Sequence, residues 1–168
     1  IQSQTLVWAA GIKANSIKGL ENANTQRGGR LKTNEFLELE NYENIYAVGD
    51  LALTPENNFP DGHPQVAQVA IQQAECLAKN LKQALKGKEP EAFAYKDLGS
   101  MATVGRNLAV VDLPTIKFQG LLAWLVWMFI HLMAIVGVRN RLVIFMNWLW
   151  NYVTYDQSLR LIIKPKSN

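Results

Sequence analysis

The chain has 168 residues and a mass of 18.9 kDa, with 49% hydrophobic and 18% charged residues. This composition supplies enough apolar side chains for the core of an ordinary domain, so it excludes a disordered chain, a collagen and a disulfide-rich mini-protein. The single cysteine, Cys76, and the two histidines, His63 and His131, provide neither an internal disulfide nor a zinc-ligand spacing. We therefore expect no metal site and a reducing compartment.

The charge is unevenly distributed along the chain. Residues 1–117 hold 12 basic and 13 acidic side chains, residues 118–138 hold none, and residues 139–168 hold five basic and one acidic. The net charge of +3 therefore arises from the C-terminal segment. Because that basic segment adjoins an uncharged, aromatic-rich one, the pattern favours an anionic membrane surface as a partner and argues against nucleic acid.

The first half of the chain predicts β-strands separated by loops. It begins at Ile1 without a basic region typical of a signal peptide, so we expect part of a longer protein. The apolar run Thr5–Ile12 predicts a buried strand that ends at a glycine. After a turn at residues 27–30, the alternation over residues 31–39 predicts a short strand or hairpin. The run Asn44–Asp50 then predicts a buried strand that delivers the Asp50 carboxylate at its C-terminal end, where ligands of open α/β sheets bind.

A helix is expected between Pro64 and Gly87, with about six turns and an apolar face formed at helical spacing. That face comprises Val66, Val69, Ala70, Ala74, Leu77, Ala78, Leu81 and Leu85. Near its start, Gln68 and Gln72 are four residues apart and so share one side of the helix. A helix N-terminus carries unpaired N–H groups and a positive partial charge, which suit the oxygen of a reduced flavin or a quinone. Ordinary surface glutamines are the alternative interpretation.

The last third of the chain predicts a β-hairpin followed by two apolar helices. Residues 100–104 and 108–111 flank a Gly-Arg-Asn turn and predict the hairpin. The 18-residue run Leu121–Val138 is long enough to reach across a bilayer, whereas Leu142–Tyr155 contains tryptophans, tyrosines and asparagines typical of an interfacial position. The segment Gly137–Arg141 predicts a helix stop with two cations. We expect a helical hairpin on or partly in the membrane, with monotopic attachment favoured over a span because His131 interrupts the first run.

Five of these segments, in this order, resemble a known family. The strand TLVWAAG and the motif NIYAVGD resemble the corresponding strands of two-dinucleotide-binding flavoproteins. The stretch AQVAIQ matches the AQxAxQ pattern of type II NADH:quinone oxidoreductases, and the hairpin and aromatic tail resemble the end of those enzymes. The resemblance covers essentially the whole chain.

The resemblance implies roles for residues that match the family's motifs. Gly49 and Asp50 would hold the ribitol of FAD, and Ala67, Gln68, Val69 and Ala70 would line the flavin. Gln68, Ile71 and Gln72 would face the quinone, and Ala10 and Gly11 would lie near the nicotinamide of NAD(H). Lys117 matches loosely a lysine near the flavin, with a cation at the membrane interface as the alternative. His131 is interpreted as packing against a partner helix or a lipid headgroup, and Cys76 as a packed thiol. The tryptophans are interpreted as membrane-belt and packing residues: Trp124, Trp127, Trp148 and Trp150.

The resemblance implies an α/β fold: part of a flavoprotein with two dinucleotide-binding domains and a C-terminal membrane-binding helical hairpin. We expect a remnant of the NAD- and FAD-binding domains over residues 1–96, the β-hairpin and its connection over 97–117, and the membrane-binding region over 118–168. The whole protein would transfer electrons from NADH through FAD to a membrane quinone without pumping protons. It would lie on the cytoplasmic side of an inner or plasma membrane, in contact with lipid, and a homodimer is left open.

Both glycine-rich phosphate-binding turns of such enzymes are missing from these residues. We therefore expect this chain alone to be inactive and to bind flavin weakly. Two alternatives stay open: a non-catalytic membrane-anchoring module derived from a flavoprotein, and a sulfide:quinone-type reductase, which would need a cysteine partner for Cys76. The sequence leaves undecided which quinone is used and whether NADPH replaces NADH.

Overall fold

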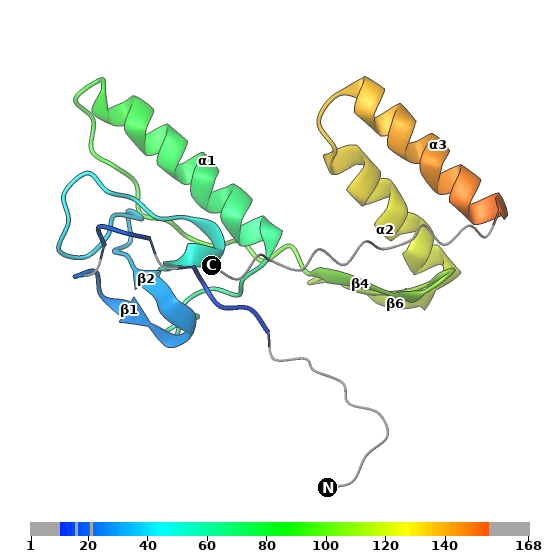
Figure 1. Cartoon of the computed structure of the whole chain (residues 1–168), viewed down its shortest axis with the longest axis horizontal. Coiled ribbons are helices and arrows are strands. Elements are labelled where there is room, and N and C mark those ends of the chain that lie inside the picture. The colour runs from blue at the N-terminus through cyan, green and yellow to red at the C-terminus, as the bar shows by residue number, and fades with distance from the viewer. Residues whose placement is uncertain (1–10, 16, 21, 155–168) are drawn as a thin grey trace, which may run out of the picture. The chain divides into compact units, whose positions relative to one another are not determined.

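The computed structural model describes residues 11–15, 17–20 and 22–154, and it divides the chain into two compact units, residues 1–97 and 98–168 (Figure 1). Each unit is considered by itself. The strand expected over Thr5–Ile12 lies mostly outside the described residues, and the two of its residues that are described, Gly11 and Ile12, are exposed.

Unit 1 is built on a small sheet of three short strands. Strand β1 (Thr25–Gln26) pairs antiparallel with β2 (Arg30–Lys32), and β2 pairs parallel with β3 (Ala52–Leu53). A 3-10 turn, η1 (Arg27–Gly29), connects β1 to β2. An isolated bridge from Thr33 to Leu39 closes the short hairpin expected over residues 31–39. The apolar core of this unit consists of Ala23, Leu31, Leu39, Ala47 and Ala52.

The prediction of a buried strand over Asn44–Asp50 is wrong. Asn44 has φ 61°, and after it only Tyr46 forms a bridge, with Glu38, while Ile45 and Tyr46 are 38% and 37% exposed. The backbone hydrogen bonds of Ile45 and Ala47 go to Leu39 and Leu37, and no ladder of strand pairing forms along this segment. The parallel strand is β3, which follows the 3-10 turn η2 (Gly49–Leu51). Asp50 therefore precedes a strand instead of ending one.

The long helix of unit 1, α1 (Ala67–Ala84), begins three residues after Pro64 and ends before Gly87, so it is shorter than expected. Its buried residues are Val69, Gln73 and Asn80. The expected apolar face is largely wrong, since Leu81 and Leu85 are exposed. The helix buries polar side chains because they bond the backbone around it: the Asn80 amide donates to the Glu91 carbonyl (2.8 Å) and accepts from the Glu91 N–H (3.0 Å).

Unit 2 begins with an antiparallel three-stranded sheet. The expected hairpin is confirmed as β4 (Ser100–Gly105) and β5 (Leu108–Asp112), and the turn between them places Asn107 at φ 62°. A third strand, β6 (Lys117–Gly120), pairs with β5 and was not expected from the sequence. It was missed because only four residues separate β5 from β6 and the strand itself lacks a clear apolar alternation.

Two helices follow the sheet, α2 (Leu121–Ala134) and α3 (Val138–Thr154) (Figure 1). The apolar run expected up to Val138 is divided because Gly137 adopts φ 86° and Arg141 Nε donates to the Ile135 carbonyl (2.7 Å), which closes the turn. The prediction of a helix stop over Gly137–Arg141 is therefore correct only at Gly137, because α3 already begins at Val138. Among the described residues, no helix is long and apolar enough to cross a bilayer.

The core of unit 2 lies where α2 packs on the sheet. Ala109 and Val111 of β5 and Ala123 of α2 are almost completely buried, and Trp124 and Trp127 pack against them. Small side chains on both elements let the helix approach the strands closely, and the indole rings fill the remaining space. The interpretation of these two tryptophans as packing residues is confirmed.

Gly99 provides a test of this packing. It has φ 88°, and a Cβ there would collide with the Asp112 carbonyl oxygen and lie 2.8 Å from Leu113 Cα. Gly137 has nearly the same φ, 86°, but its Cβ would meet only Asn140 Nδ2, at 3.7 Å. Because both substitutions carry the strain of a left-handed backbone, their difference isolates the collision.

We expect Gly99→Ala to lower the free energy of unfolding of the full chain by about 3 kcal/mol or more, and Gly137→Ala by about 1 kcal/mol. Denaturant unfolding followed by tryptophan fluorescence measures both, since four of the five tryptophans lie in unit 2. Equal losses for the two variants would contradict this packing of β4 against the end of β5.

Candidate functional site

The Gly49–Asp50 turn is fixed directly to the first turns of α1. The Gly49 N–H donates to Gln73 Oε1 (2.7 Å), and Gln65 Nε2 donates to the Asp50 carbonyl (2.9 Å). Gly49 has φ 69°, and a Cβ there would lie 3.2 Å from the Ala70 Cβ. Glycine is therefore favoured here both by the backbone conformation and by the close approach of the helix.

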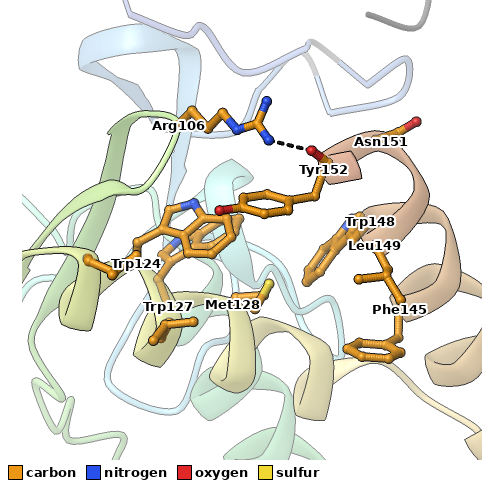
Figure 2. Close-up of a pocket in the computed structure, with 11 residues that line it drawn as sticks. Arg106, Trp124, Trp127, Met128, Phe145, Trp148, Leu149, Asn151 and Tyr152 are labelled. Carbon is orange, nitrogen blue, oxygen red and sulfur yellow. Dashed lines mark hydrogen bonds between the residues drawn. The ribbon is translucent and has the colours of Figure 1, made fainter. Parts of the chain in front are cut away.

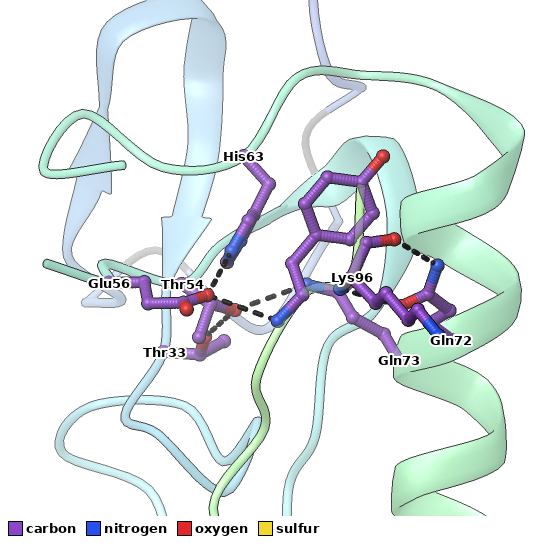
Figure 3. A network of polar contacts seen from close by, with 8 residues as sticks. Thr33, Thr54, Glu56, His63, Gln72, Gln73 and Lys96 are labelled. Atoms are coloured by element: carbon purple, nitrogen blue, oxygen red, sulfur yellow. Dashed lines mark hydrogen bonds and ion pairs between the residues drawn. The ribbon is translucent and has the colours of Figure 1, made fainter. Parts of the chain in front are cut away.

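Gln73 is the residue that joins the turn, the sheet and the helix. Its side chain is 1% exposed, and its Nε2 donates to Thr54 Oγ1 (3.3 Å), which shares a hydrogen bond with Thr33 Oγ1 (2.7 Å). Figure 3 shows these side chains in the interior of unit 1. Both ends of the buried amide are thus bonded, as a buried polar group requires. Sequence reasoning missed Gln73, although its position four residues after the buried Val69 places it on the inward side of the helix.

The Asp50 side chain is exposed, and among the described residues no hydrogen bond or ion pair occupies its carboxylate. Nearby, burial lowers the pKa of the Arg30 guanidinium, and the charge of Asp50 opposes that shift. Arg30 itself is held by the Ala52 carbonyl, to which its Nε donates at 2.9 Å. The carboxylate is therefore available to accept hydrogen bonds from a ligand.

The start of α1 divides into an exposed side and a buried side. Ala67, Gln68 and Ile71 are exposed, whereas Val69 is 2% exposed and Ala70 is half-buried against Gly49. No side chain caps the helix, so its first N–H groups keep their capacity to bind an acceptor. The side chain of Val69 is buried in the unit, and its N–H already donates to the Val66 carbonyl (3.1 Å).

Gln72 differs from Gln68 in that its amide is already engaged. Its Nε2 donates to the Lys96 carbonyl (2.9 Å), and its Oε1 accepts from the Lys96 N–H (3.0 Å) (Figure 3). These two bonds tie the segment before Asp97 to the start of α1. The shared helix side expected for the two glutamines thus holds an exposed amide and one that is bonded to the chain.

A second clamp holds the same segment. Glu56 Oε2 accepts a hydrogen bond from the Tyr95 N–H (3.2 Å) and lies 2.8 Å from His63 Nε2 (Figure 3). Burial opposes ionisation of Glu56, yet the bonds from His63 and Tyr95 hold its pKa below the usual value. The buried His63 ring also packs edge-on against Phe93 and Tyr95. This cluster has no local sequence signal, because Phe93 and Tyr95 lie 30 or more residues after Glu56 and His63.

The remaining predicted residues belong to other parts of the chain. Ala10 is outside the described residues, and Gly11 is exposed. Lys117 is in unit 2, at the start of β6, where it forms an exposed ion pair with Asp112 (3.0 Å). These positions leave the proposed nicotinamide and flavin roles of the three residues as expectations.

The two other residues that could be reactive, Cys76 and His131, have surroundings that favour a packing role. Burial, assisted by the charge of Glu91, raises the pKa of the Cys76 thiol, which disfavours the reactive thiolate. His131 Nδ1 bonds the Trp127 carbonyl (2.7 Å), and the two rings stack. Within the part of the chain that the structure describes, no cluster of His, Cys, Asp or Glu could hold a metal ion.

Two family models match the chain. Residues 1–74 match the pyridine nucleotide-disulphide oxidoreductase family, and residues 98–154 match the NDH2 C-terminal domain. The type II NADH:quinone oxidoreductase Ndh of Mycobacterium tuberculosis is 35% identical over 155 residues, which cover 88% of this chain and 32% of that protein. The enzyme of the same description from Staphylococcus aureus is 33% identical over 107 residues, 64% of this chain and 26% of that protein.

The fold agrees with these matches. The structure of NDH2 from Plasmodium falciparum in complex with NADH superposes with a TM-score of 0.75 at 17% identity, covering 91% of this chain and 46% of that one. The chain thus has the α/β fold of the pyridine nucleotide-disulphide oxidoreductases. Within that class, the relatives that align with most of this chain are type II NADH:quinone oxidoreductases, the family that its sequence motifs resemble. It spans about a third of the length of the curated relatives it matches.

Replacing Gln73 tests the link between helix and turn. We expect Gln73→Leu to lower the free energy of unfolding of the full chain by about 2 kcal/mol, because it leaves the Gly49 N–H and the Thr54 hydroxyl without their partner. Gln68→Leu is the matched control, since Gln68 is exposed on the same helix and should change the stability by less than about 0.5 kcal/mol. Denaturant unfolding followed by circular dichroism measures both, and an unchanged Gln73→Leu midpoint would contradict the assignment.

Proposed function

We propose that this chain is part of a membrane-associated enzyme that transfers electrons from NADH through FAD to a membrane quinone without pumping protons. Its share of that enzyme would be the flavin-facing turn, the helix behind it and the membrane-binding helices. The observation that carries the proposal is the bond from Gly49 to Gln73, which fixes the Gly-Asp turn beside the exposed start of α1. The similarity of the chain to type II NADH:quinone oxidoreductases supports the same reaction.

The residues at this turn fit a flavin. The exposed Asp50 carboxylate would accept hydrogen bonds from the ribitol hydroxyls, and the Gln65 bond to its carbonyl would keep the turn in place. Ala67 and Ala70 are small enough to admit a flat ring at the helix start, and the uncapped N–H groups there would stabilise negative charge on a flavin oxygen. When bound, FAD supplies the hydride and electron chemistry, for which the chain needs no nucleophile of its own.

For the quinone, we assign the polar contact to Gln68 and the apolar contact to Ile71, which are both exposed at the start of α1. Gln72 would act at the edge of that site by holding the Lys96 backbone in place. Ala10 and Gly11 would lie along the nicotinamide, where small residues allow close approach of a ring. We retain Lys117 as a residue that would approach the flavin in the whole protein.

Membrane attachment would come from α2 and α3. One side of α2 packs on the sheet through Ala123, Trp124 and Trp127, while its other side exposes large apolar residues. Those exposed on the two helices include Leu122, Leu125, Phe129, Ile130, Met133, Leu142, Val143, Met146, Trp150 and Val153. A helix with one side on protein and the other apolar side open suits an interfacial position parallel to the bilayer. We propose monotopic attachment on the cytoplasmic side.

Two substitutions in the whole protein should separate flavin binding from quinone reduction. We expect Asp50→Ala to weaken FAD binding about tenfold or more, because a charged acceptor of hydrogen bonds is lost. We expect Gln68→Ala to lower kcat/KM for a quinone about tenfold while reduction of a soluble acceptor by NADH stays within about twofold. Flavin absorbance after gel filtration and steady-state kinetics with each acceptor measure the two effects.

Glu75→Ala is the control for these variants, because Glu75 is exposed on the same helix and has no assigned role. It should leave both flavin content and quinone turnover unchanged. Unaltered NADH oxidation by the Asp50→Ala variant would contradict the proposed enzymatic function and favour the membrane-anchoring alternative.

The mode of attachment can be tested by extraction. If α2 and α3 lie in the interface, alkaline carbonate should release the whole protein from membranes, and removing residues 121–154 should leave it in the soluble fraction. Immunoblots of the membrane and supernatant fractions measure both results. Resistance to alkali until detergent is added would contradict monotopic attachment.

A further inference from the structure

Unit 2 contains a pocket between α2 and α3. Its volume is about 660 Å³, within the range of about 300–1,000 Å³ typical of ligand-binding cavities. The wall is mostly aromatic and aliphatic, and its principal residues are Trp124, Trp127, Phe145, Trp148, Leu149 and Tyr152. The Trp127 and Trp148 rings stack with centroids 6.1 Å apart, so the wall is formed by residues of both helices that already contact one another. Such a surface favours an apolar ligand.

Among the described residues that line this pocket, one is a cation. Arg106, from the turn between β4 and β5, donates to the Tyr152 carbonyl, and its guanidinium carbon lies 4.3 Å from the centroid of the Tyr152 ring. Figure 2 shows Arg106, Tyr152 and Asn151 at one end of the pocket and Phe145 at the other. None of the described residues that line the pocket is acidic. The pocket is therefore apolar over most of its length and has a guanidinium group at one end.

We propose that this pocket binds one phospholipid with an anionic headgroup, whose acyl chain lies between α2 and α3 and whose phosphate lies against Arg106. An acyl chain matches the apolar wall, and a phosphate group is the acceptor that a guanidinium binds best. The hydrogen bond and the ring contact to Tyr152 hold the guanidinium in position before the lipid arrives. A quinone also has an apolar tail, but its neutral head group does not match the charge at the rim. The inference rests on the proposed membrane attachment, which brings the pocket to a lipid phase.

The test is lipid retention by the whole protein in detergent, measured by native mass spectrometry. Delipidated protein is mixed with phosphatidylglycerol or with phosphatidylcholine of the same acyl chains. We expect one bound phosphatidylglycerol per chain and at least a tenfold preference over phosphatidylcholine. Arg106→Gln should reduce that retention at least tenfold. The matched control, Arg139→Gln, removes the same charge from α3 outside the pocket and should reduce retention less than twofold.

Arg106→Gln also removes the contact with Tyr152, so a second variant addresses the pocket itself. Leu125 lines the pocket and is 44% exposed, and Leu125→Trp should fill the space, abolish lipid retention and leave Arg106 in place. Retention unchanged in Leu125→Trp would overturn the proposal. Equal losses for Arg106→Gln and Arg139→Gln, equal binding of both lipids, or displacement of the lipid by decylubiquinone would do so as well.

Vesicle sedimentation separates this inference from the membrane proposal. All three variants should still sediment with vesicles that contain phosphatidylglycerol, because the exposed apolar residues of both helices remain. Sedimentation without retained lipid in the wild-type protein would overturn only the lipid site. Failure of the wild-type protein to sediment would instead count against membrane attachment.

Discussion

The arrangement of unit 1 depends on a single buried amide. Gln73 bonds the Gly49 backbone with its oxygen and the Thr54 hydroxyl with its nitrogen, so one side chain connects the helix, the Gly-Asp turn and the strand that follows. An amide buried without partners would cost a few kcal/mol, so the helix and the turn must keep one relative position. That constraint leaves Asp50 and the first residues of α1 exposed side by side as a rigid surface. In the function proposed above, this fixed arrangement would matter because a flavoenzyme controls its cofactor through position and hydrogen bonding.

The same helix shows why polar residues can occupy a buried face. Gln73 and Asn80 can be buried because each bonds the backbone of a neighbouring segment, at Gly49 and at Glu91. Gln72 and Glu56 likewise bond backbone groups, because they accept hydrogen bonds from the Lys96 N–H and the Tyr95 N–H. Together these side chains supply hydrogen bonds that a larger sheet would otherwise provide. The apolar residues near the end of α1, Leu81 and Leu85, are left exposed as a consequence.

Unit 2 is packed differently: small side chains lie at the contact between α2 and the sheet, and many large apolar side chains of α2 and α3 are exposed. Ala109 and Ala123 allow α2 to lie close to the sheet, and the rings of Trp124 and Trp127 complete the core. The exposed surface of α2 and α3 is then rich in Leu, Met and Phe, an arrangement that suits a lipid phase better than water. Arg106 connects the sheet to this surface by bonding the last turn of α3, so one side chain both stabilises the helix end and places a charge beside the apolar pocket.

The sequence by itself determined the elements whose signals are local. The hairpin around Gly105–Asn107, the helix after Pro64 and the division of the C-terminal run at Gly137 follow from turn residues and from periodicity, and the motifs in their order identified the family. Only the tertiary structure decided that Gln73 holds the turn, that Gln72 is engaged while Gln68 is exposed, and that Arg106 reaches α3. These contacts join residues 24 to 46 positions apart, and periodicity within one element carries no information about them. The buried strand expected before Asp50 failed for the same reason: an apolar run becomes a strand only where a neighbouring segment supplies its hydrogen bonds.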